Sequence, residues 1–317
     1  MVKEQPCLPA PFIVGADRSG TTLLQAMLDA HPDLAVLPET YWLSGALTIC
    51  RHSAEPHADF IRFVEQQERW SLLNLTHEAL EAAVGAVQPF DLAAAMRAIY
   101  GLYARNAGKQ RWGDKTPYYL MHLLPLARLF PEAHFIHVIR DGRDQALSIL
   151  AVPWGPTTLP QAAQQWRKQL GWARWCARKV PHYIEVHYEE LVSNPEQTLR
   201  RICAYLHLPW HPQMLEYPRY SQVATNAAYL ALTHNPRVRE RPQRRVERWR
   251  SEMKAEDCAC FEALAGDLLR DLGYPLSVPP SRFVQAQWSM RTALRKTRWR
   301  LRSWLIGFES LFGRGNC

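Results

Sequence analysis

Short apolar runs alternate with longer amphipathic stretches along the first two thirds of the chain. Four runs have the length and composition of buried strands: 12–14, 34–37, 134–140 and 183–188. The segments between them place apolar residues at helical spacing, and the first does so at Leu23, Leu24, Met27 and Leu28. Strands that alternate with helices in this way predict an α/β fold, in which helices flank a central parallel sheet in three layers.

Further helices are expected around the third and fourth strands. They cover 119–130, a segment with Ala146 to Leu150, 161–179 and the residues after Asn194, the predicted N-cap. Residues 41–107 form a helical insertion with breaks near Pro56 and Pro89. We expect this insertion to cover an edge of the sheet, either as one wall of an acceptor site or as a plain packing layer. The polar segment 111–117 is expected to be a turn.

The turn between the first strand and the first helix has the composition of an anion site. It reads Gly15-Ala16-Asp17-Arg18-Ser19-Gly20-Thr21-Thr22. Backbone N–H groups of such a turn point inward, and the dipole of the following helix adds partial positive charge. The spacing is close to that of the phosphate-binding loop, but Thr21 stands where that loop carries lysine. The turn is therefore suited to a phosphate-like anion rather than to ordinary ATP chemistry.

The same run carries a family resemblance. Arg18-Ser19-Gly20-Thr21-Thr22, followed by Leu23-Leu24, resembles the 5′-phosphosulfate loop of sulfotransferases, and the continuation through Glu39-Thr40 is most similar to the tyrosylprotein and bacterial branches. The resemblance implies a P-loop-like fold and 3′-phosphoadenosine-5′-phosphosulfate (PAPS) as sulfonate donor, released as adenosine 3′,5′-bisphosphate. The residues implied to bind the 5′ end are Arg18, Ser19, Gly20, Thr21 and Thr22. Asp17 departs from the family, because many relatives have proline there, and its carboxylate must point away or pair with Arg18.

A second match surrounds the end of the strand 134–140. Arg140 closes this strand, and Ser148 lies eight residues further on, about two helical turns. In sulfotransferases an Arg and a Ser at this spacing hold the 3′-phosphate of the donor. The alternative is a surface ion pair between Arg140 and Asp144, with Ser148 facing its own helix.

Lys115 is a predicted catalytic residue, together with Arg18. Tyrosylprotein sulfotransferases have a similar lysine between polar residues and a proline, and there it contacts the sulfonate and the bridging oxygen. Lys115 would offset charge on the leaving phosphate, and Asp114 would orient it or cap the next segment. The alternative is an exposed loop lysine.

Glu39 is the predicted general base. It follows a strand close to the first loop, and partial burial would supply the raised pKa that such a base uses. The alternative is that Glu39 caps a helix beginning near Thr40. Three histidines remain rival bases: His52, His57 and His122.

Other predicted donor contacts rest on weaker matches. Tyr188 occupies a family position near the adenosine, although a core tyrosine is also consistent with its surroundings. The arginine-rich run 237–250 resembles the segment that closes over the donor, and within it we name Arg248 and Trp249. Its alternative is a solvated basic helix face. The histidines do not show metal-ligand spacing, and one-step sulfonate transfer does not demand Mg²⁺, so we expect no metal.

Charge is unevenly distributed along the 317 residues. The net charge is +8, yet 281–317 holds eight Lys or Arg and one acid, which leaves residues 1–280 nearly neutral. We expect one sulfotransferase domain over 1–280 and a basic amphipathic tail over 281–317. Such a tail would pack on the domain, support a homodimer or lie on a membrane surface, and we favour the first two.

Location is predicted from apolar runs and cysteines. No stretch of 18 apolar residues occurs, so we expect no membrane span. The first eleven residues lack the apolar core of a signal peptide. The seven cysteines include no C-x-x-C pair, which fits free thiols in a reducing compartment. The expected location is the cytoplasm.

The function that follows is PAPS-dependent transfer of a sulfonate group to a hydroxyl or amine of a small-molecule acceptor, as in bacterial secondary metabolism. We expect no nucleic-acid partner. Three alternatives stay open. The first is a tyrosine-peptide sulfotransferase. The second is a P-loop small-molecule kinase, which would need the missing loop lysine and a Mg²⁺-binding aspartate. The third is a non-enzymatic binder of membranes or nucleic acid that uses the basic tail. The identity of the acceptor stays open.

Overall fold

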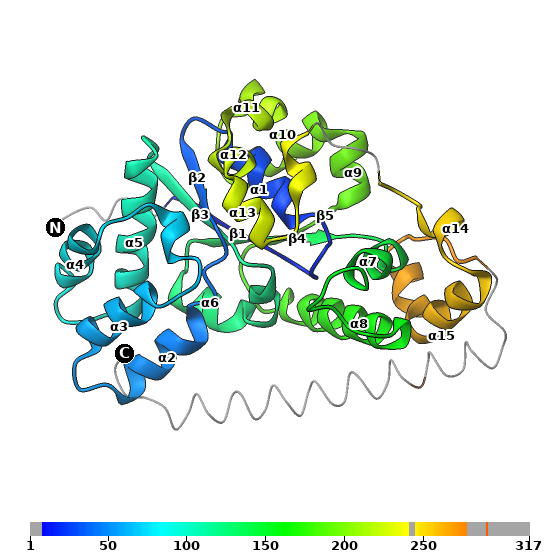
Figure 1. Cartoon of the computed structure of the whole chain (residues 1–317), viewed down its shortest axis with the longest axis horizontal. Coiled ribbons are helices and arrows are strands. Elements are labelled where there is room, and N and C mark those ends of the chain that lie inside the picture. Colours follow the sequence, from blue (N-terminus) through cyan, green and yellow to red (C-terminus); the bar gives the residue numbers. More distant parts are fainter. Residues whose placement is uncertain (1–7, 241–244, 278–289, 291–317) are drawn as a thin grey trace. The chain divides into compact units, whose positions relative to one another are not determined.

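A computed structural model describes residues 8–240, 245–277 and 290 of the chain (Figure 1). In this part of the chain, one sheet is formed by β1 (Ala10–Gly15), β2 (Leu34–Leu37), β3 (Arg111–Lys115), β4 (Ala133–Ile139) and β5 (Tyr183–His187). The strand order is β2-β3-β1-β4-β5, and every pairing is parallel. The predicted α/β class with a central parallel sheet is confirmed.

Both faces of the sheet are buried, as parallel sheets require. Alternation along β1 sends Phe12 to one face and Ile13 to the other, opposite Phe135 and Ile136 of β4. The centroid of the Phe12 ring lies 5.9 Å from that of Phe135 and 6.1 Å from that of Trp112. Ile13 and Ile136 instead join the apolar side chains of α1 in a buried hydrophobic core.

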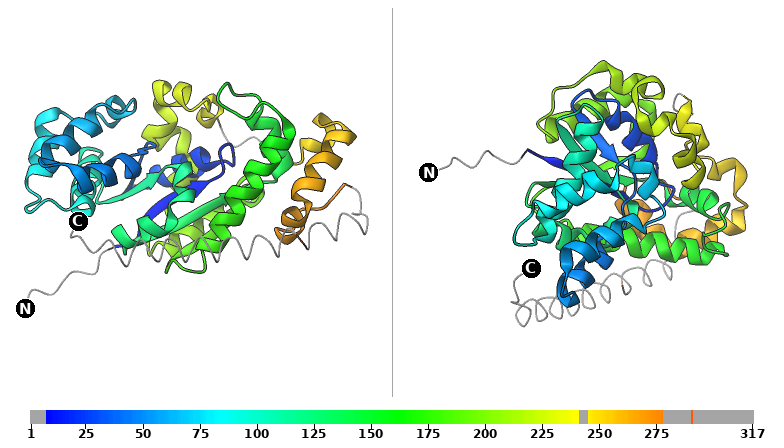
Figure 2. Two further views of the ribbon diagram at one scale, coloured as in Figure 1. Left: turned by 90° about the horizontal axis from the view of Figure 1, so that it is seen from below. Right: turned by 60° about the vertical axis from the view of Figure 1, so that its left-hand side comes forward.

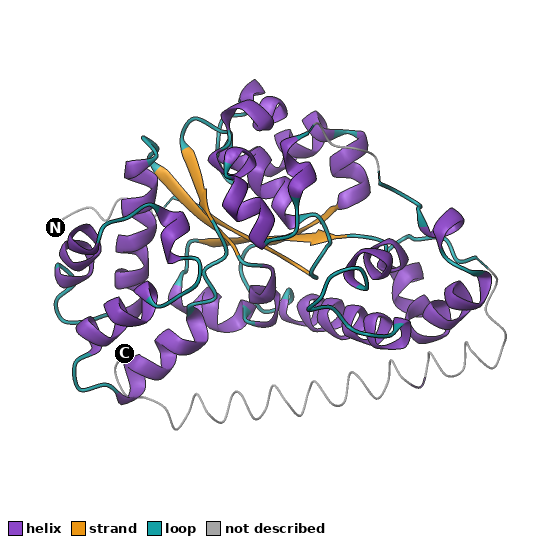
Figure 3. Cartoon of the chain, viewed as in Figure 1, coloured by secondary structure: helices purple, strands orange, loops and turns teal. Residues whose placement is uncertain are grey.

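Helices cover the two faces, as Figures 1 and 3 show. One face carries α1 (Thr21–Asp29), α9 (Tyr188–Ser193), α10 (Pro195–Tyr205), η3 (Pro212–Glu216), α11 (Tyr217–Tyr220), α12 (Gln222–Thr225), α13 (Ala227–Leu232) and η4 (Pro236–Arg239). The other carries α5 (Leu92–Asn106), η2 (Pro117–Met121) and α6 (Leu123–Leu129). Asn194 is the N-cap of α10, with Pro195 at its first position, as predicted.

Residues 41–107 are helical and include α2 (Leu43–His52), α3 (Pro56–Glu65), η1 (Trp70–Leu73) and α4 (His77–Gly85), before α5. Successive helices of this segment pack against one another, and α5 also packs on β2 and β3. The turned views in Figure 2 show these blue and cyan helices gathered beside the β2 side of the sheet. The segment therefore lies at the edge where β2 ends the sheet.

Two local predictions are wrong. The segment 111–117 was expected to be a turn, but its first five residues form β3, the strand between β2 and β1. Its polarity is tolerated because distant groups satisfy it: Arg111 donates to the backbone carbonyls of Pro9 and Leu206 at 2.6 and 2.7 Å. The helix expected over 119–130 is divided into η2 and α6 at His122.

The chain separates into two compact units, Met1–Arg140 with Lys168–Val246, and Asp141–Arg167 with Glu247–Cys317. The first contains the sheet. Helix α8 (Leu159–Cys176) contributes residues to both. The second contains α7 (Gly142–Ile149), α14 (Trp249–Glu252) and α15 (Ala255–Asp271).

Arg143 is the centre of the second unit. Its buried guanidinium pairs with Asp141 and Glu262, both at 2.7 Å, and lies 3.5 Å from the centroid of the Trp249 ring. The predicted domain boundary at 280 stays a prediction. The predicted tail lies outside the described residues, Met290 apart.

Candidate active site

The strands of the parallel sheet end at one edge, where ligands of such sheets bind. A predicted site residue ends or follows each strand: Gly15 ends β1, Glu39 follows β2, Lys115 ends β3, Arg140 follows β4 and Tyr188 follows β5. The fold therefore brings together residues that lie up to 173 positions apart in the sequence.

The loop between β1 and α1 has the backbone of an anion site. Gly20 has a φ of 103°, and a Cβ built on it would lie 2.5 Å from the Tyr188 ring, so only glycine fits. No side chain caps α1, whose first residue is Thr21. The Ser19 hydroxyl is buried and has no hydrogen-bond partner among the described residues. An anion at this helix N-terminus would satisfy these donors.

Arg18 joins this loop to the chain after α13. Its guanidinium donates to the carbonyls of Thr233 and His234, both at 3.1 Å. Burial lowers the pKa of Arg18, and the charges of Arg140 and Arg245 lower it further. Positive charges held this close together favour an anion between them.

Arg140 lies against the same loop. It donates to the carbonyl of Arg18 at 3.2 Å and to that of Arg245 at 2.8 Å. Its guanidinium also lies 4.6 Å from the centroid of the Tyr188 ring. Arg140 is buried, so the alternative of a surface position is wrong. Tyr188 packs between Gly20 and Arg140, which places its ring at the loop.

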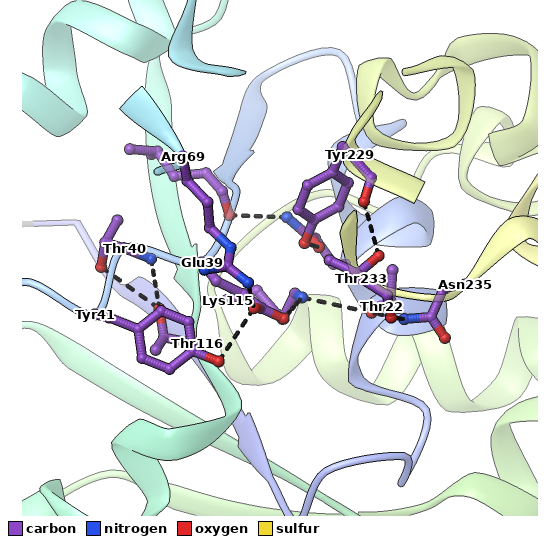
Figure 4. Close-up of polar contacts among 12 residues, drawn as sticks. Thr22, Glu39, Thr40, Tyr41, Arg69, Lys115, Thr116, Tyr229, Thr233 and Asn235 are labelled. Carbon is purple, nitrogen blue, oxygen red and sulfur yellow. Dashed lines mark hydrogen bonds and ion pairs between the residues drawn. The ribbon is translucent and has the colours of Figure 1, made fainter. Parts of the chain in front are cut away.

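Lys115 and Glu39 form a buried ion pair, with 2.6 Å between Nζ and Oε1 (Figure 4). Lys115 Nζ also lies 3.4 Å from the Thr22 hydroxyl on α1. Lys115 is fully buried, so the exposed loop lysine is excluded. Because α2 begins at Leu43, Glu39 does not cap a helix at Thr40.

The environment of Glu39 corrects one expectation. Burial alone would raise the pKa of Glu39, but the charges of Lys115 and Arg69 outweigh it, and the pKa is lowered. The predicted raised pKa is therefore wrong. The pKa of a neighbouring carboxyl, Asp17, is raised to about 6 by burial and by the nearby charge of Glu39.

A buried hydrogen-bond network fixes the backbone next to Glu39. The Thr40 N–H donates to the Thr116 hydroxyl at 2.9 Å, and the Thr40 hydroxyl donates to Asp114 Oδ2 at 2.8 Å. Tyr100 of α5 donates to the same Asp114 oxygen at 3.2 Å, and burial raises the pKa of Asp114 to about 6. Asp114 thus holds the turn that carries Glu39.

Sequence reasoning missed two residues that contact Glu39. Arg69 Nη2 lies 3.2 Å from Glu39 Oε2, and the Tyr41 hydroxyl donates to this oxygen at 3.1 Å (Figure 4). In the sequence, Tyr41 stands out only as the first residue of the insertion 41–107. Nothing local to Arg69, thirty positions after Glu39, indicates this contact.

Three predicted donor contacts belong to the second unit. Ser148 is half-buried on α7, and Trp249 is buried against Arg143. Arg248 pairs with Glu252 one helical turn later. Their roles stay predictions.

Among the described residues, none of the three rival histidines makes a hydrogen bond or an ion pair with Glu39 or Lys115. His52 is exposed at the end of α2, and His57 Nε2 lies 2.6 Å from the Val87 carbonyl. His122 is half-buried, with its ring 5.2 Å from that of Tyr118.

Within residues 8–240, 245–277 and 290, neither a metal site nor a membrane-spanning helix is found. There, no group of three His, Cys, Asp or Glu side chains could hold a metal ion. Across the same ranges, no helix combines the length and the apolar character needed to cross a membrane.

Comparison with known proteins identifies the family. Residues 9–212 match the model described as the Sulfotransferase family. Protein-tyrosine sulfotransferase 1 of Danio rerio is 29% identical over 216 residues, which cover 66% of this chain and 56% of that protein. The chain thus spans about half the length of this relative. Nodulation protein NoeE of Sinorhizobium fredii is 29% identical over 303 residues, covering 86% of this chain and 67% of that protein.

A solved structure shares the fold. The sulfotransferase domain of the Synechococcus PCC 7002 olefin synthase superposes with a TM-score of 0.61 at 24% identity, covering 86% of this chain and 96% of that one. At this identity the similarity concerns the fold alone. The family match confirms the resemblance carried by residues 18–22, and the chain belongs to the sulfotransferase family.

Proposed function

We propose that the protein transfers the sulfonate group of PAPS to a hydroxyl or amine of a small-molecule acceptor. The observation that carries this proposal is the buried ion pair between Lys115 and Glu39. Lys115 lies beside Thr22, in the first turn of α1, and the loop before α1 has the backbone of an anion site. A cation and a carboxylate next to an anion site are the groups needed to stabilise a leaving phosphate and to accept a proton.

The residues of the first unit fit a donor with two anionic ends. Ser19 and the first-turn N–H groups of α1 would hold the 5′ phosphosulfate, together with Arg18. Arg140 would hold the 3′-phosphate, and Tyr188 would lie against the adenosine. An anion would also relieve the repulsion that lowers the pKa of Arg18. Ser148, Arg248 and Trp249 remain proposed contacts.

PAPS supplies an electrophilic sulfonate, and adenosine 3′,5′-bisphosphate is the leaving group. The acceptor oxygen or nitrogen forms the new bond to sulfur, and Glu39 takes the proton that the acceptor loses. With its pKa lowered, Glu39 is ionised at neutral pH, which is the form a base needs. Lys115 donates toward the charge that develops on the leaving phosphate. As the Lys115 ammonium turns toward the leaving phosphate, it moves away from Glu39. The proton affinity of the Glu39 carboxylate then rises while the acceptor loses its proton.

The surroundings of Glu39 support a small acceptor. Tyr41 and Tyr118 are 37% and 50% exposed, and their ring centroids lie 6.4 Å apart, which offers apolar contact next to the base. An acidic peptide would need free cations there, and Arg69 is already paired with Glu39. A tyrosine peptide is the second candidate, because a relative at 29% identity is protein-tyrosine sulfotransferase 1 of Danio rerio.

Binding and transfer measurements test the proposal. Calorimetry should show adenosine 3′,5′-bisphosphate binding more tightly than AMP or ATP with Mg²⁺. Radiolabelled PAPS should then label one of three acceptors: 4-nitrophenol, glucosamine or an acidic tyrosine peptide. Preferred binding of ATP with Mg²⁺ and phosphoryl transfer would overturn the function, and preferential labelling of the peptide would move the acceptor to the second candidate.

A further inference from the structure

The carboxylate of Glu39 has two oxygens in different surroundings. Oε1 accepts from Lys115 Nζ at 2.6 Å, while Oε2 accepts from the Tyr41 hydroxyl and ion-pairs with Arg69. A carboxylate oxygen has about two acceptor positions. Among the described residues, Oε2 therefore faces two partners, Tyr41 and Arg69, whereas Oε1 faces only Lys115 (Figure 4). The oxygen with room for an acceptor proton is the one beside Lys115.

Most of the polar contacts of Arg69 are made with Glu39 and its neighbour Tyr41. Arg69 precedes η1, and its guanidinium lies 5.0 Å from the centroid of the Tyr41 ring, so the ring supports the cation. Its other ion pair is with the exposed Glu68, at 3.7 Å. Arg69 Nε is buried and makes no hydrogen bond to the described residues. A scaffold arginine such as Arg111 instead donates to several backbone carbonyls.

Tyr41 is held in a conformation that serves the same contact. Its φ of 52° lies in the left-handed region, which is unfavourable for a residue other than glycine. This backbone turns the Tyr41 ring toward Arg69 and its hydroxyl toward Glu39. Strain of this kind persists where the surrounding contacts fix it, which here are the contacts to Glu39 and Arg69.

We propose that Arg69 is a positioning residue that clamps Oε2 of Glu39, with Tyr41 as its support, and leaves Oε1 to receive the acceptor proton. This inference rests on the proposed function, because it assigns the residue that orients the base. It gives the helical segment 41–107 a part in the reaction, since Arg69 and Tyr41 both belong to it. A proton delivered to Oε1 arrives next to Lys115, where the leaving phosphate would be stabilised.

Other charged groups face Glu39 and must be held constant in a test. They are the charged or titratable groups Lys115 of β3 and Asp17 and Arg18 of the β1–α1 loop, together with the neutral phenol of Tyr229 of α13. Arg69→Gln removes one cation and leaves these groups in place. Arg69→Lys keeps the charge, and Tyr41→Phe removes the hydroxyl but keeps the ring. Arg62→Gln is the matched control, because Arg62 lies in the same segment, is exposed and pairs only with Asp59 among the described residues.

The first readout is the titration of the Glu39 carboxyl carbon, followed by NMR in ¹³C-glutamate-labelled full-length protein and assigned by its loss in Glu39→Gln. In Arg69→Gln the midpoint should move to higher pH, because a neighbouring cation that favours the ionised form is gone. Tyr41→Phe should move it less in the same direction. In Arg69→Lys and Arg62→Gln the midpoint of the Glu39 titration should stay close to that of the parent protein. An unchanged midpoint in Arg69→Gln would overturn the clamp.

The second readout is the pH profile of sulfonate transfer to whichever of the three acceptors is labelled. Arg69→Gln should lower kcat with little change in KM for PAPS, and the acid limb should move to higher pH. If Arg69 only supports the fold, Arg69→Gln should lower the melting temperature and the amount of active enzyme but leave the acid limb of the pH profile in place. That result would contradict the proposal. The NMR titration needs neither donor nor acceptor, so the two proposals can fail separately. If the parent protein transfers sulfonate but the Glu39 midpoint is the same in Arg69→Gln, only the clamp is rejected. If the Glu39 midpoint moves in Arg69→Gln but the parent protein transfers no sulfonate, only the proposed function is rejected.

Discussion

The two ends of the sheet are both polar, yet their polar groups are satisfied in different ways. At the carboxyl end, charged side chains contact one another, as Lys115 and Glu39 do, and the buried Ser19 hydroxyl has no partner in the described chain. At the amino end, side chains bind backbone carbonyls: Arg111 binds those of Pro9, Leu206 and His207, and His134 lies 2.9 Å from that of Glu132. The carboxyl end therefore has the Ser19 hydroxyl left for a ligand. The amino end leaves Arg111 Nε without a partner in the described chain, but the other two nitrogens of that guanidinium bind carbonyls of the protein itself.

This difference predicts two kinds of mutant. Substitutions at the carboxyl end should change binding or turnover while the protein stays folded. Substitutions at the amino end should change stability and leave binding alone. A variant that does the opposite would break the comparison.

Glu39→Gln should produce the largest effect. Glutamine can still accept from Lys115 but cannot take a proton, so turnover should fall by roughly 10²–10⁴-fold, the usual contribution of a general base. The variant should still bind adenosine 3′,5′-bisphosphate, as measured by calorimetry. A near-normal rate would move the base to a histidine, with His122 tested first because its ring neighbours Tyr118.

Arg140→Ala should weaken the same ligand selectively. The lost charge-assisted contact contributes about 1.5–3 kcal/mol, which corresponds to roughly 10- to 150-fold in the dissociation constant. AMP, which lacks the 3′-phosphate, should bind nearly as before. Equal loss for both ligands would show that Arg140 supports the loop through the Arg18 carbonyl rather than the phosphate.

Arg111→Met tests the amino end. Three backbone carbonyls lose a charged donor, so we expect the free energy of unfolding to fall by about 1.5–3 kcal/mol in denaturant titrations. Affinity for adenosine 3′,5′-bisphosphate should not change at temperatures where the variant is folded. Weaker binding with unchanged stability would mean that the two ends of the sheet are coupled.

The same contrast explains what the sequence could predict. The loop 15–22 was predicted because its donors are consecutive in the chain and need only a strand before and a helix after them. The strand β3 was missed because Arg111 and Asp114 look like turn residues until their partners are known. Those partners include Leu206 and Thr40, which are distant in sequence and meet them only in the fold.

Arg69 was missed for a related reason. Glu39 could be placed at a strand end, but its pKa depends on which charges the fold brings beside it. Burial alone favours the raised value that we expected, and the neighbouring cations reverse it. Position along a strand is therefore readable from sequence, whereas the electrostatics of the site are set by contacts between distant segments.

A smaller effect concerns pH at the amino end. The ring of His134 stacks on that of His182 at 4.1 Å between centroids, and His207 and Arg111 lie nearby. Burial lowers the pKa of His134, and the charges of these neighbours lower it further. Below the unfolded value of about 6.5, the unfolded chain therefore takes up a proton before the folded one does. Stability from this group should fall as pH drops below about 6.5.

His134→Asn should remove this contribution, since asparagine can still donate to the Glu132 carbonyl but does not titrate. We expect the difference in unfolding free energy between variant and parent to shift in favour of the variant as pH is lowered from 7.5 to about 5.5. Taking the difference matters, because Asp17 and Asp114, with pKa values of about 6, make the parent protein gain stability over part of the same range. His52→Asn at an exposed position of α2 controls for the loss of a histidine. A difference that does not vary with pH would show that His134 protonates equally well in the folded and unfolded chain.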